Sequence, residues 1–464
     1  MKNKFLLVTF VMVFSQLVFA QNEANIWYFG GNAGLDFNTK APSAIVDGKL
    51  NSWEGAASMC NSSGRLLFYT DGVTIWDSTH NVMPNGIGLK GNQSSTQVAL
   101  IVPKPFSPNI YYLFISQECT EAKKSTGGFF YSEVDMNLNF GKGDVVAKSK
   151  NTLITSQVSE KLCSVKHSNG KDYWIVIYKI NSDTMFAYRI TEFGIDFKPV
   201  ISKTGVKITA NSQYGGTIGQ MKISPNGKKI GVSNFSDSTV ANLVGDFNAF
   251  NGKVNNLIPF KCKFSYGLEF SPDSRYFYIT ELYTKKLIQF DATATSQLRL
   301  IGSKKNITTN FQNAVGSLQL GPDRKIYLTE EVSNSLHVIH APNMQGNSCR
   351  FESNYINLNG KVSLSGLPNF VSSYFKAPTS SEKDVMSGVL ISPNPNNGQF
   401  TIYIRSPKEE RLLVIYNSIG QIIYKETFTS GFLDVNLSIA NGIYLADVSY
   451  GANHSVFKVF INKY

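Results

Sequence analysis

The sequence has few charged residues and no clustered metal ligands. Asp, Glu, Lys and Arg make up 17% of its 464 residues, and its 5 cysteines and 5 histidines form neither a CxxC motif nor a Cys/His cluster. This spacing argues against a zinc site. The motifs GxSxG and HExxH are also missing, which argues against the hydrolase classes that depend on them.

The cysteines are too scattered to define a disulfide framework. They are Cys60, Cys119, Cys163, Cys262 and Cys349. An odd number leaves at least one unpaired unless it bonds to another molecule. Three of them, Cys60, Cys163 and Cys262, fall in strand-like runs, where a cysteine usually serves as a small buried hydrophobe.

Long apolar runs are confined to the start of the chain. Residues 1–20 have the parts of a secretory signal peptide, namely Lys2 and Lys4, an apolar stretch over 5–14, and a small-residue cleavage site ending at Ala20. The apolar stretch is shorter than the roughly 20 residues of a membrane span. We therefore expect an exported mature chain with no membrane span.

Basic residues outnumber acidic residues, but the lysines are not clustered in one stretch of the sequence. The formal charge is +11, and the signal peptide contributes two units of it, which leaves +9 for the mature chain. The extra lysines occur as separate pairs beside turns, whereas a nucleic-acid binder carries a basic stripe with stacking aromatics. The pattern indicates a solvated basic surface and no nucleic-acid partner.

A degenerate repeat indicates an all-β fold. The unit is an apolar strand, a tight turn with Pro-Asn or Pro-Asp, and a second apolar strand, followed by a third strand. Proline pre-sets the first central turn position and Asn or Asp accepts the second. The clearest copies are 221–232, 268–279 and 318–328, and weaker copies are 57–69, 98–114 and 162–176.

The repeat predicts a seven-bladed β-propeller over residues 21–375. Six full units and a terminal partial one, Gly366–Val371, recur about every 40 to 65 residues, as expected for four-stranded blades. The partial unit needs outer strands, which residues 25–30 and 34–37 can supply. Pairing the two ends in one blade would close the ring and remove exposed sheet edges. An open array of β-sandwiches is the alternative fold.

The remaining residues divide into a linker and a small domain. Residues 376–388 are polar and carry Pro and Ser, as a linker does. Residues 389–464 have about seven short strand signals, which predict a small β-sandwich.

Several motifs resemble known families. The propeller region resembles a Bacteroidetes family of secreted β-propeller proteins, on the stretches 26–30, 67–72, 97–105, 318–323 and 366–370. The C-terminal region resembles the type IX secretion (Por secretion system) C-terminal sorting domain. The matching motif residues are Pro393, Asn394, Pro395, Gly398, Gly420, Gly442 and Tyr444. This resemblance implies export through both membranes to the cell surface or the medium, with the type IX secretion machinery as a partner.

Candidate site residues lie where inner strands begin, because these positions converge on the mouth of a propeller channel. They are Glu54, Gln97, Glu160, Lys161, Gln220 and Tyr266. Polar and aromatic groups on a concave mouth suit recognition of a ligand. We expect a non-catalytic module without a cofactor that binds a protein or a glycan.

Two other interpretations of these residues stay open. Such side chains also fasten neighbouring blades by hydrogen bonds. A propeller hydrolase or lactonase would instead hold a divalent metal near Glu54 and Glu160. His337 and His340 cannot join such a site together, since residues three apart on a strand point to opposite faces.

Three short motifs resemble the O-glycosylation pattern of exported Bacteroidetes proteins. Their acceptor residues are Ser78, Thr184 and Ser238, each directly after an aspartate.

Overall fold

The computed structural model describes residues 22–463 except 40, 118–126, 210–214, 377–388, 393, 395, 405–409, 431, 451 and 452. The predicted signal peptide and nearly all of the predicted linker lie outside these residues. The chain divides into two compact units, Met1–Lys376 and Ala377–Tyr464.

Seven antiparallel sheets make up the described part of the first unit. Six of them follow the predicted repeat in chain order, and we call these the first to sixth blades. The first blade is β4 (Ala57–Cys60), β5 (Leu66–Thr70), β6 (Thr74–Asp77) and β7 (Val82–Ile87). The second is β8 (Ala99–Pro103), β9 (Ile110–Ser116), β10 (Gly128–Asp135), β11 (Asp144–Val145) and β12 (Thr152–Ser156). The third is β13 (Val158–Lys166), β14 (Tyr173–Lys179), β15 (Ser182–Thr191), β16 (Gly194–Ile195) and β17 (Val200–Ile208).

The next three blades have four strands each. The fourth is β18 (Met221–Ile223), β19 (Lys229–Val232), β20 (Asn242–Phe247) and β21 (Val254–Phe260). The fifth is β22 (Ser265–Phe270), β23 (Tyr276–Glu281), β24 (Lys286–Asp291) and β25 (Lys305–Thr308), with helix α1 (Gln297–Gly302) before its last strand. The sixth is β26 (Val315–Leu320), β27 (Ile326–Glu330), β28 (Ser335–Ile339) and β29 (Phe351–Asn357). Short 3-10 turns lie at Asn139–Gly141, Gly346–Cys349 and Ser372–Phe375.

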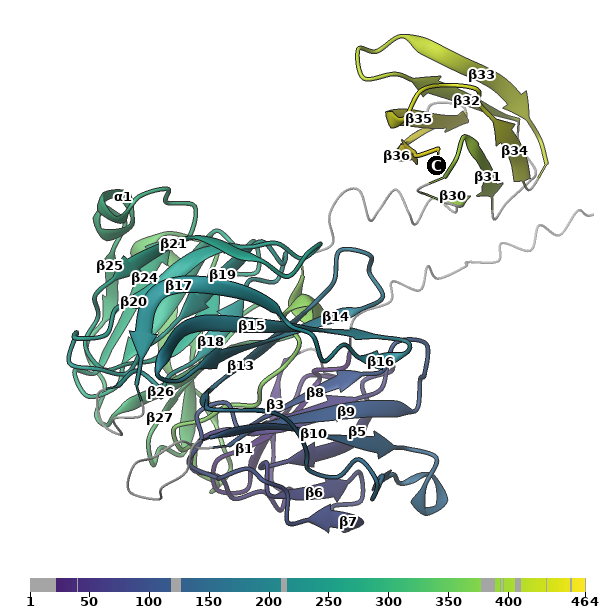
Figure 1. Ribbon diagram of the computed structural model, residues 1–464. Helices are drawn as coiled ribbons and strands as arrows, with labels where there is room; N and C mark the ends of the chain where they lie inside the picture. The colour runs from purple at the N-terminus through teal and green to yellow at the C-terminus, as the bar shows by residue number, and fades with distance from the viewer. Residues whose placement is uncertain are drawn as a thin grey trace, which may run out of the picture. The chain divides into compact units, whose positions relative to one another are not determined.

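The N-terminal residues form the seventh blade, which has three strands. These are β1 (Ile26–Phe29), β2 (Ala33–Asp36) and β3 (Ser43–Ile45). Each innermost strand contacts that of the next blade, from β1 and β4 through to β22 and β26, and β29 contacts β3. The seven sheets therefore close into a propeller, and Figure 1 shows them following one another from purple to green. Its largest core cluster runs between blades and includes Trp27, Phe68 and Leu318.

The hairpins predicted from Pro-Asn and Pro-Asp are confirmed as β18–β19, β22–β23 and β26–β27. In each turn the residue after Asn or Asp has a left-handed backbone, with φ of 71° at Gly227, 65° at Ser274 and 64° at Arg324. That residue reverses the chain within one blade, so local turn chemistry is enough to place the hairpin.

The predicted way of closing the ring is partly wrong. In the described chain, residues 367–370 form no ladder with β1. The longer segment 362–371 instead makes single bridges. They join Val362 to Gly31, Pro368 to Ala56, and Val371 to Ser164. Proline has no N–H to give to a ladder, so Pro368 disfavours a regular strand here. The N-terminal sheet still closes the ring, because it packs against β4 on one side and β29 on the other.

The second unit has two sheets, in agreement with the predicted small sandwich. One is β30 (Val389–Ser392), β31 (Gln399–Ile404) and β34 (Phe432–Asn436). The other is β32 (Arg411–Tyr416), β33 (Ile422–Phe428), β35 (Gly442–Tyr450) and β36 (Asn453–Ile461). Both sheets contribute to one apolar core that includes Ile402, Leu413 and Val459.

Candidate binding site at the channel mouth

Three of the six predicted mouth residues, Glu54, Glu160 and Tyr266, meet at the end of the channel where the inner strands begin. The Tyr266 hydroxyl donates to Glu54 Oε2 at 2.8 Å, across 212 positions of sequence. The Ser94 hydroxyl donates to Glu54 Oε1 at 3.4 Å. Burial raises the pKa of Glu54 well above its usual range, and the nearby Glu160 carboxylate raises it further. We call Glu54, Thr96, Glu160 and Tyr266 the mouth cluster.

Thr96 lies at the centre of the mouth cluster. Its backbone N–H and its hydroxyl both donate to Glu160 Oε2 at 2.9 Å. The same hydroxyl accepts from the Gly219 N–H at 3.2 Å. Thr96 therefore fixes the position of the Glu160 carboxylate and links it to the fourth blade through Gly219.

Lys161 is fully buried, and its ammonium group donates hydrogen bonds to backbone carbonyls. Its Nζ donates to the carbonyls of Ile218, Gly219 and Ser233 at 2.7, 2.9 and 2.6 Å. Burial lowers the pKa of Lys161 to about 7, and the Glu160 carboxylate opposes this shift. The ammonium therefore fastens the third blade to the fourth and does not point into the mouth.

Gln97 and Gln220 lie deeper and also join blades. Gln97 Oε1 accepts from the N–H groups of Met221 and Leu162 at 2.7 and 3.3 Å. Gln220 Oε1 accepts from the N–H groups of Leu268 and Leu318 at 3.0 and 3.1 Å. Each glutamine thus accepts from the N–H groups of two inner strands that are not paired in one sheet. This is the blade-fastening role that the sequence left open as an alternative to ligand binding.

Exposed aromatic rings flank the mouth cluster. Trp53, directly before Glu54, is 47% exposed, and Tyr283 is 62% exposed. The Tyr283 ring lies 5.5 Å from the rings of Phe235 and Phe264, and Phe235 packs in one cluster with Tyr266. Exposed aromatic surface therefore adjoins the mouth cluster, on Trp53 next to Glu54 in the sequence and on Tyr283 next to the cluster that contains Tyr266.

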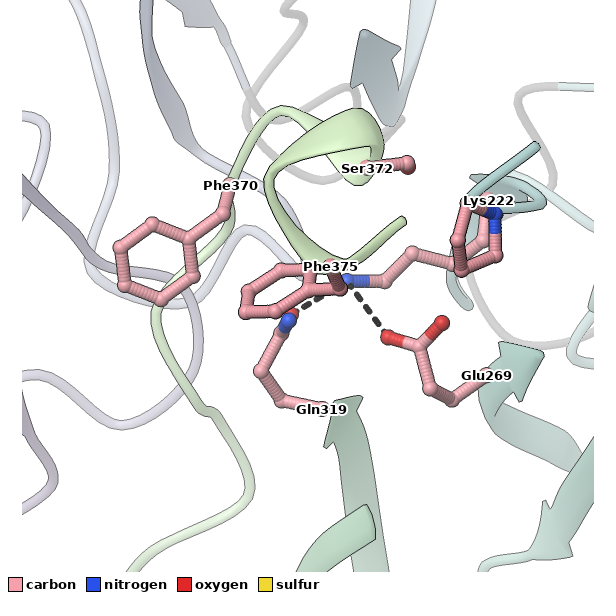
Figure 2. Close-up of a pocket in the computed structure, with 7 residues that line it drawn as sticks. Lys222, Glu269, Gln319, Phe370, Ser372 and Phe375 are labelled. Atoms are coloured by element: carbon pink, nitrogen blue, oxygen red, sulfur yellow. Dashed lines mark hydrogen bonds and ion pairs between the residues drawn. The ribbon is translucent and has the colours of Figure 1, made fainter. Parts of the chain in front are cut away.

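The opposite end of the channel is filled by the chain itself. The segment 366–375 passes the Glu54 carbonyl so closely that a Cβ on Gly366 would lie 1.5 Å from that oxygen. It then runs along the inner strands to Phe375, which covers Lys222, Glu269 and Gln319 (Figure 2). Lys222 Nζ lies 2.5 Å from Gln319 Oε1 and 3.4 Å from Glu269 Oε2, all buried. The chain's own residues therefore close this end of the channel.

We expect stability to depend on pH through Glu54. Its pKa is raised in the folded state, so its favourable contribution is complete below about pH 4.5 and is lost as pH rises through the folded pKa. Glu54→Gln keeps an acceptor for Tyr266 and cannot ionise. The variant should melt roughly 2 °C above wild type near about pH 8 and close to wild type near about pH 4. Thermal unfolding at both values checks this. An offset that is constant with pH would contradict it.

The two histidines point to different partners, as the sequence predicts. His337 Nε2 lies 3.0 Å from Glu330 and is buried, whereas His340 Nε2 lies 2.7 Å from Glu352. The four described cysteines, Cys60, Cys163, Cys262 and Cys349, are free and buried. Within the described ranges, no three His, Cys, Asp or Glu residues gather as a metal site would require.

The predicted glycosylation residues differ in accessibility. Ser78 is exposed in the turn between β6 and β7, and Ser238 is half-buried. Thr184 is buried in β15, where its hydroxyl accepts from Lys203 Nζ at 3.0 Å. Only Ser78 fully exposes its side chain in the folded protein, so it is the acceptor that we retain as a proposal.

The sorting-motif residues fasten the last strand of the second unit. Asn394 Nδ2 donates to the Lys458 carbonyl at 2.7 Å, and its Oδ1 accepts from the Phe460 N–H at 2.8 Å. Gly398 has φ of 103°, and a Cβ there would lie 2.4 Å from the Leu437 carbonyl.

The other motif residues lie in turns and at a strand start. Gly420 has φ of 82° in the turn between β32 and β33, and Gly442 opens β35. The Tyr444 hydroxyl donates to the Ala440 carbonyl at 2.8 Å. Pro393 and Pro395 fall outside the described residues.

The fold thus defines a β-propeller followed by a small β-sandwich, and the sandwich can be assigned to a family. Residues 390–462 match the model of the secretion system C-terminal sorting domain. This domain directs the chain through type IX secretion to the cell surface or the medium. Among the residues described, no helix is long and apolar enough to cross a membrane.

The whole chain is similar to several solved structures at low identity. The surface component PorZ of the type IX secretion system of Porphyromonas gingivalis is 10% identical with a TM-score of 0.35, over 93% of this chain and 63% of PorZ. This chain therefore spans less than two thirds of PorZ. A putative 6-phosphogluconolactonase from Bacteroides fragilis is 14% identical with a TM-score of 0.38, over 82% of this chain and 97% of the other. The comparison with curated proteins found no significant match.

Sequence reasoning missed Thr96, Ser94 and Trp53. Thr96 and Ser94 belong to the polar run 92–97, in which no pattern separates one hydroxyl from the next. Trp53 had a usable signal, because a tryptophan beside a predicted mouth carboxylate is a rare pairing of residue types in a chain with 4 tryptophans.

Proposed function

We propose that the exported propeller is a non-catalytic binding module whose mouth takes a glycan. The observation that carries this proposal is that Trp53, the residue directly before Glu54, exposes 47% of its surface. The C–H face of a sugar packs on an aromatic ring, and its hydroxyls bond to carboxyl and phenol groups nearby. A few fixed polar groups among aromatic side chains is the usual composition of a small-ligand site.

The carboxyl groups of the mouth cluster already accept hydrogen bonds within the protein, which supports a binding function over catalysis. Both Glu54 oxygens accept hydrogen bonds, and Glu160 Oε2 accepts two from Thr96. A divalent metal between Glu54 and Glu160, as in the hydrolase or lactonase alternative, would have to displace these donors. Lys161 is held by three carbonyls, so it is not placed to act as a general base.

A glycan array probed with the full mature chain tests this function. We expect retention of a set of related glycans in the presence of EDTA, and retention by Trp53→Phe but not by Trp53→Ala. Failure to retain any glycan would contradict the proposal. Hydrolysis of a lactone or ester that needs an added divalent ion would instead support the alternative.

Export should depend on the sorting domain. Deleting residues 389–464 removes the whole second sandwich, so a folded propeller should accumulate in the periplasm. Gly398→Val should have a similar but weaker effect, because its side chain would collide with the Leu437 carbonyl. Cell fractionation and immunoblotting measure the distribution. A truncated chain found mainly at the surface or in the medium would refute this dependence.

A further inference from the structure

Four phenylalanines stand exposed on turns at the end of the propeller away from the mouth. In an antiparallel blade, the turns between the first and second strands and between the third and fourth strands lie at the same end. Phe106 follows β8, Phe140 follows β10, Phe193 follows β15 and Phe250 follows β20. Their exposed fractions are 67%, 103%, 93% and 70%. We call these four residues the aromatic rim.

The turns that carry the rim are tied to one another. Asn109 Nδ2 donates to Asn137 Oδ1 at 2.8 Å, which joins the turns of Phe106 and Phe140. Lys171 of the third blade lies 5.3 Å from the centroid of the Phe106 ring. His167, on the same turn as Lys171, has its ring 6.1 Å from that of Phe250. The rim is therefore continuous across the second, third and fourth blades.

The turn of Phe193 is joined to this group through an ion pair. Arg189 of β15 contacts Asp172, beside Lys171, at 2.6 Å. The pair neutralises the carboxylate nearest Lys171. Phe193 lies in the turn between β15 and β16, at the same end of the propeller as the other three rings.

Backbone strain holds two of the rings outward. Phe106 and Phe140 both have φ of 57°, and Asn139 beside Phe140 has φ of 51°. A left-handed backbone is unfavourable for a bulky side chain, and such strain concentrates where a chain binds something. A fully exposed phenylalanine in this conformation gains no packing in return within the protein.

We propose that the aromatic rim docks the exported protein on a lipid surface with anionic headgroups. Among the rim residues, Phe250 has its ring against that of His167, and Phe140 and Phe193 protrude with exposed fractions of 103% and 93%. Protruding rings suit insertion at the boundary between headgroups and acyl chains.

Charge on the same turns favours anionic lipid. Lys142, Lys171 and Lys198 are exposed and Lys104 is half-buried. The opposing carboxylates are Glu192, Asp196 and Asp135, and Asp135 already accepts from the backbone and side chain of Asn137. Because lysines near an anionic membrane add attraction, the rim should prefer such a surface to a neutral one. The chain reaches the cell surface by its sorting domain, so it meets a membrane after export.

Vesicle flotation with the full mature chain tests the proposal. We expect binding to vesicles of equal parts phosphatidylcholine and phosphatidylglycerol, and weaker binding to phosphatidylcholine alone. The double variant Phe140→Ser and Phe193→Ser should bind about tenfold less. The matched control is Ile87→Ser with Val332→Ser, two exposed apolar residues of the propeller outside the rim, and it should bind as wild type.

Three outcomes would overturn the proposal. They are no vesicle binding by the wild type, equal binding by the rim variant, and equal loss in the control. Sedimentation of the same proteins distinguishes a second copy as the occupant, because loss of a dimer in the rim variant without vesicle binding also refutes the lipid assignment. None of these results depends on the glycan site, which lies at the other end of the channel.

Discussion

Trp27→Ala should destabilise the propeller by about 3 to 5 kcal/mol, the usual cost of truncating a buried tryptophan. Trp27 is fully buried, and its Nε1 donates to the Ala24 carbonyl at 2.8 Å. Its ring lies 4.8 Å from Phe37 and 5.8 Å from both Tyr327 and Phe370. One side chain thus joins the N-terminal sheet, the sixth blade and the segment that fills the channel.

The reason for a large effect is that Trp27 lies at the closure of the ring. A cavity at this position would weaken the packing between the first and last parts of the propeller sequence. The loss of stability should therefore appear as one cooperative unfolding transition. Denaturant unfolding followed by tryptophan fluorescence measures it. All 4 tryptophans lie in the propeller, so the signal excludes the sorting domain. Trp53→Ala is the control and should change the free energy of unfolding by less than about 0.5 kcal/mol, since Trp53 is exposed. A loss below about 1 kcal/mol for Trp27→Ala would show that the ring does not close through this residue.

Gln220→Leu should destabilise the propeller by about 2 to 5 kcal/mol, because it leaves two buried N–H groups without an acceptor. These belong to Leu268 and Leu318, the inner strands of the fifth and sixth blades. Leucine has nearly the volume of glutamine, so the change removes the hydrogen bonds without opening a cavity. The variant should therefore weaken the attachment of the fifth and sixth blades to the segment that carries residue 220.

The matched control for this variant is Gln93→Leu. Gln93 is exposed, and its Nε2 donates to Asp71 Oδ2 at 2.9 Å. Its replacement should cost less than about 0.5 kcal/mol. Denaturant unfolding of both variants decides the matter. Equal values for the two would mean that the inner strands hold together without the amide of Gln220.

The blades could be predicted because their signals are local. A Pro-Asn or Pro-Asp turn and its two apolar strands, as at 221–232, specify a hairpin within a dozen residues. The second and third blades were harder to delimit, since each has a fifth strand that leaves the meander, β12 and β17. The course of 362–371 was not predictable, because its partners Gly31, Ala56 and Ser164 belong to three different blades.

The mouth could be predicted only as a set of positions. Each inner strand begins at the mouth, and the structure brings Glu54, Glu160 and Tyr266 near one another there. The direction of each side chain was not available from the sequence. Lys161 is adjacent to Glu160, yet it turns to three backbone carbonyls, which lie just before β18 and just after β19 of the fourth blade and accept from its ammonium. Gln97 and Gln220 are engaged in the opposite sense, because their Oε1 atoms accept from backbone N–H groups 48 to 124 positions away in sequence.

Calorimetric titration of an array-selected glycan into the mature chain tests the central claim, that the mouth is a metal-independent binding site. We predict the same affinity with and without EDTA, and a loss of at least about tenfold in Trp53→Ala, as expected for a central aromatic contact. Trp53→Phe should retain most of the affinity. Binding that needs a divalent ion, or that is unchanged in Trp53→Ala, would contradict the assignment of the site.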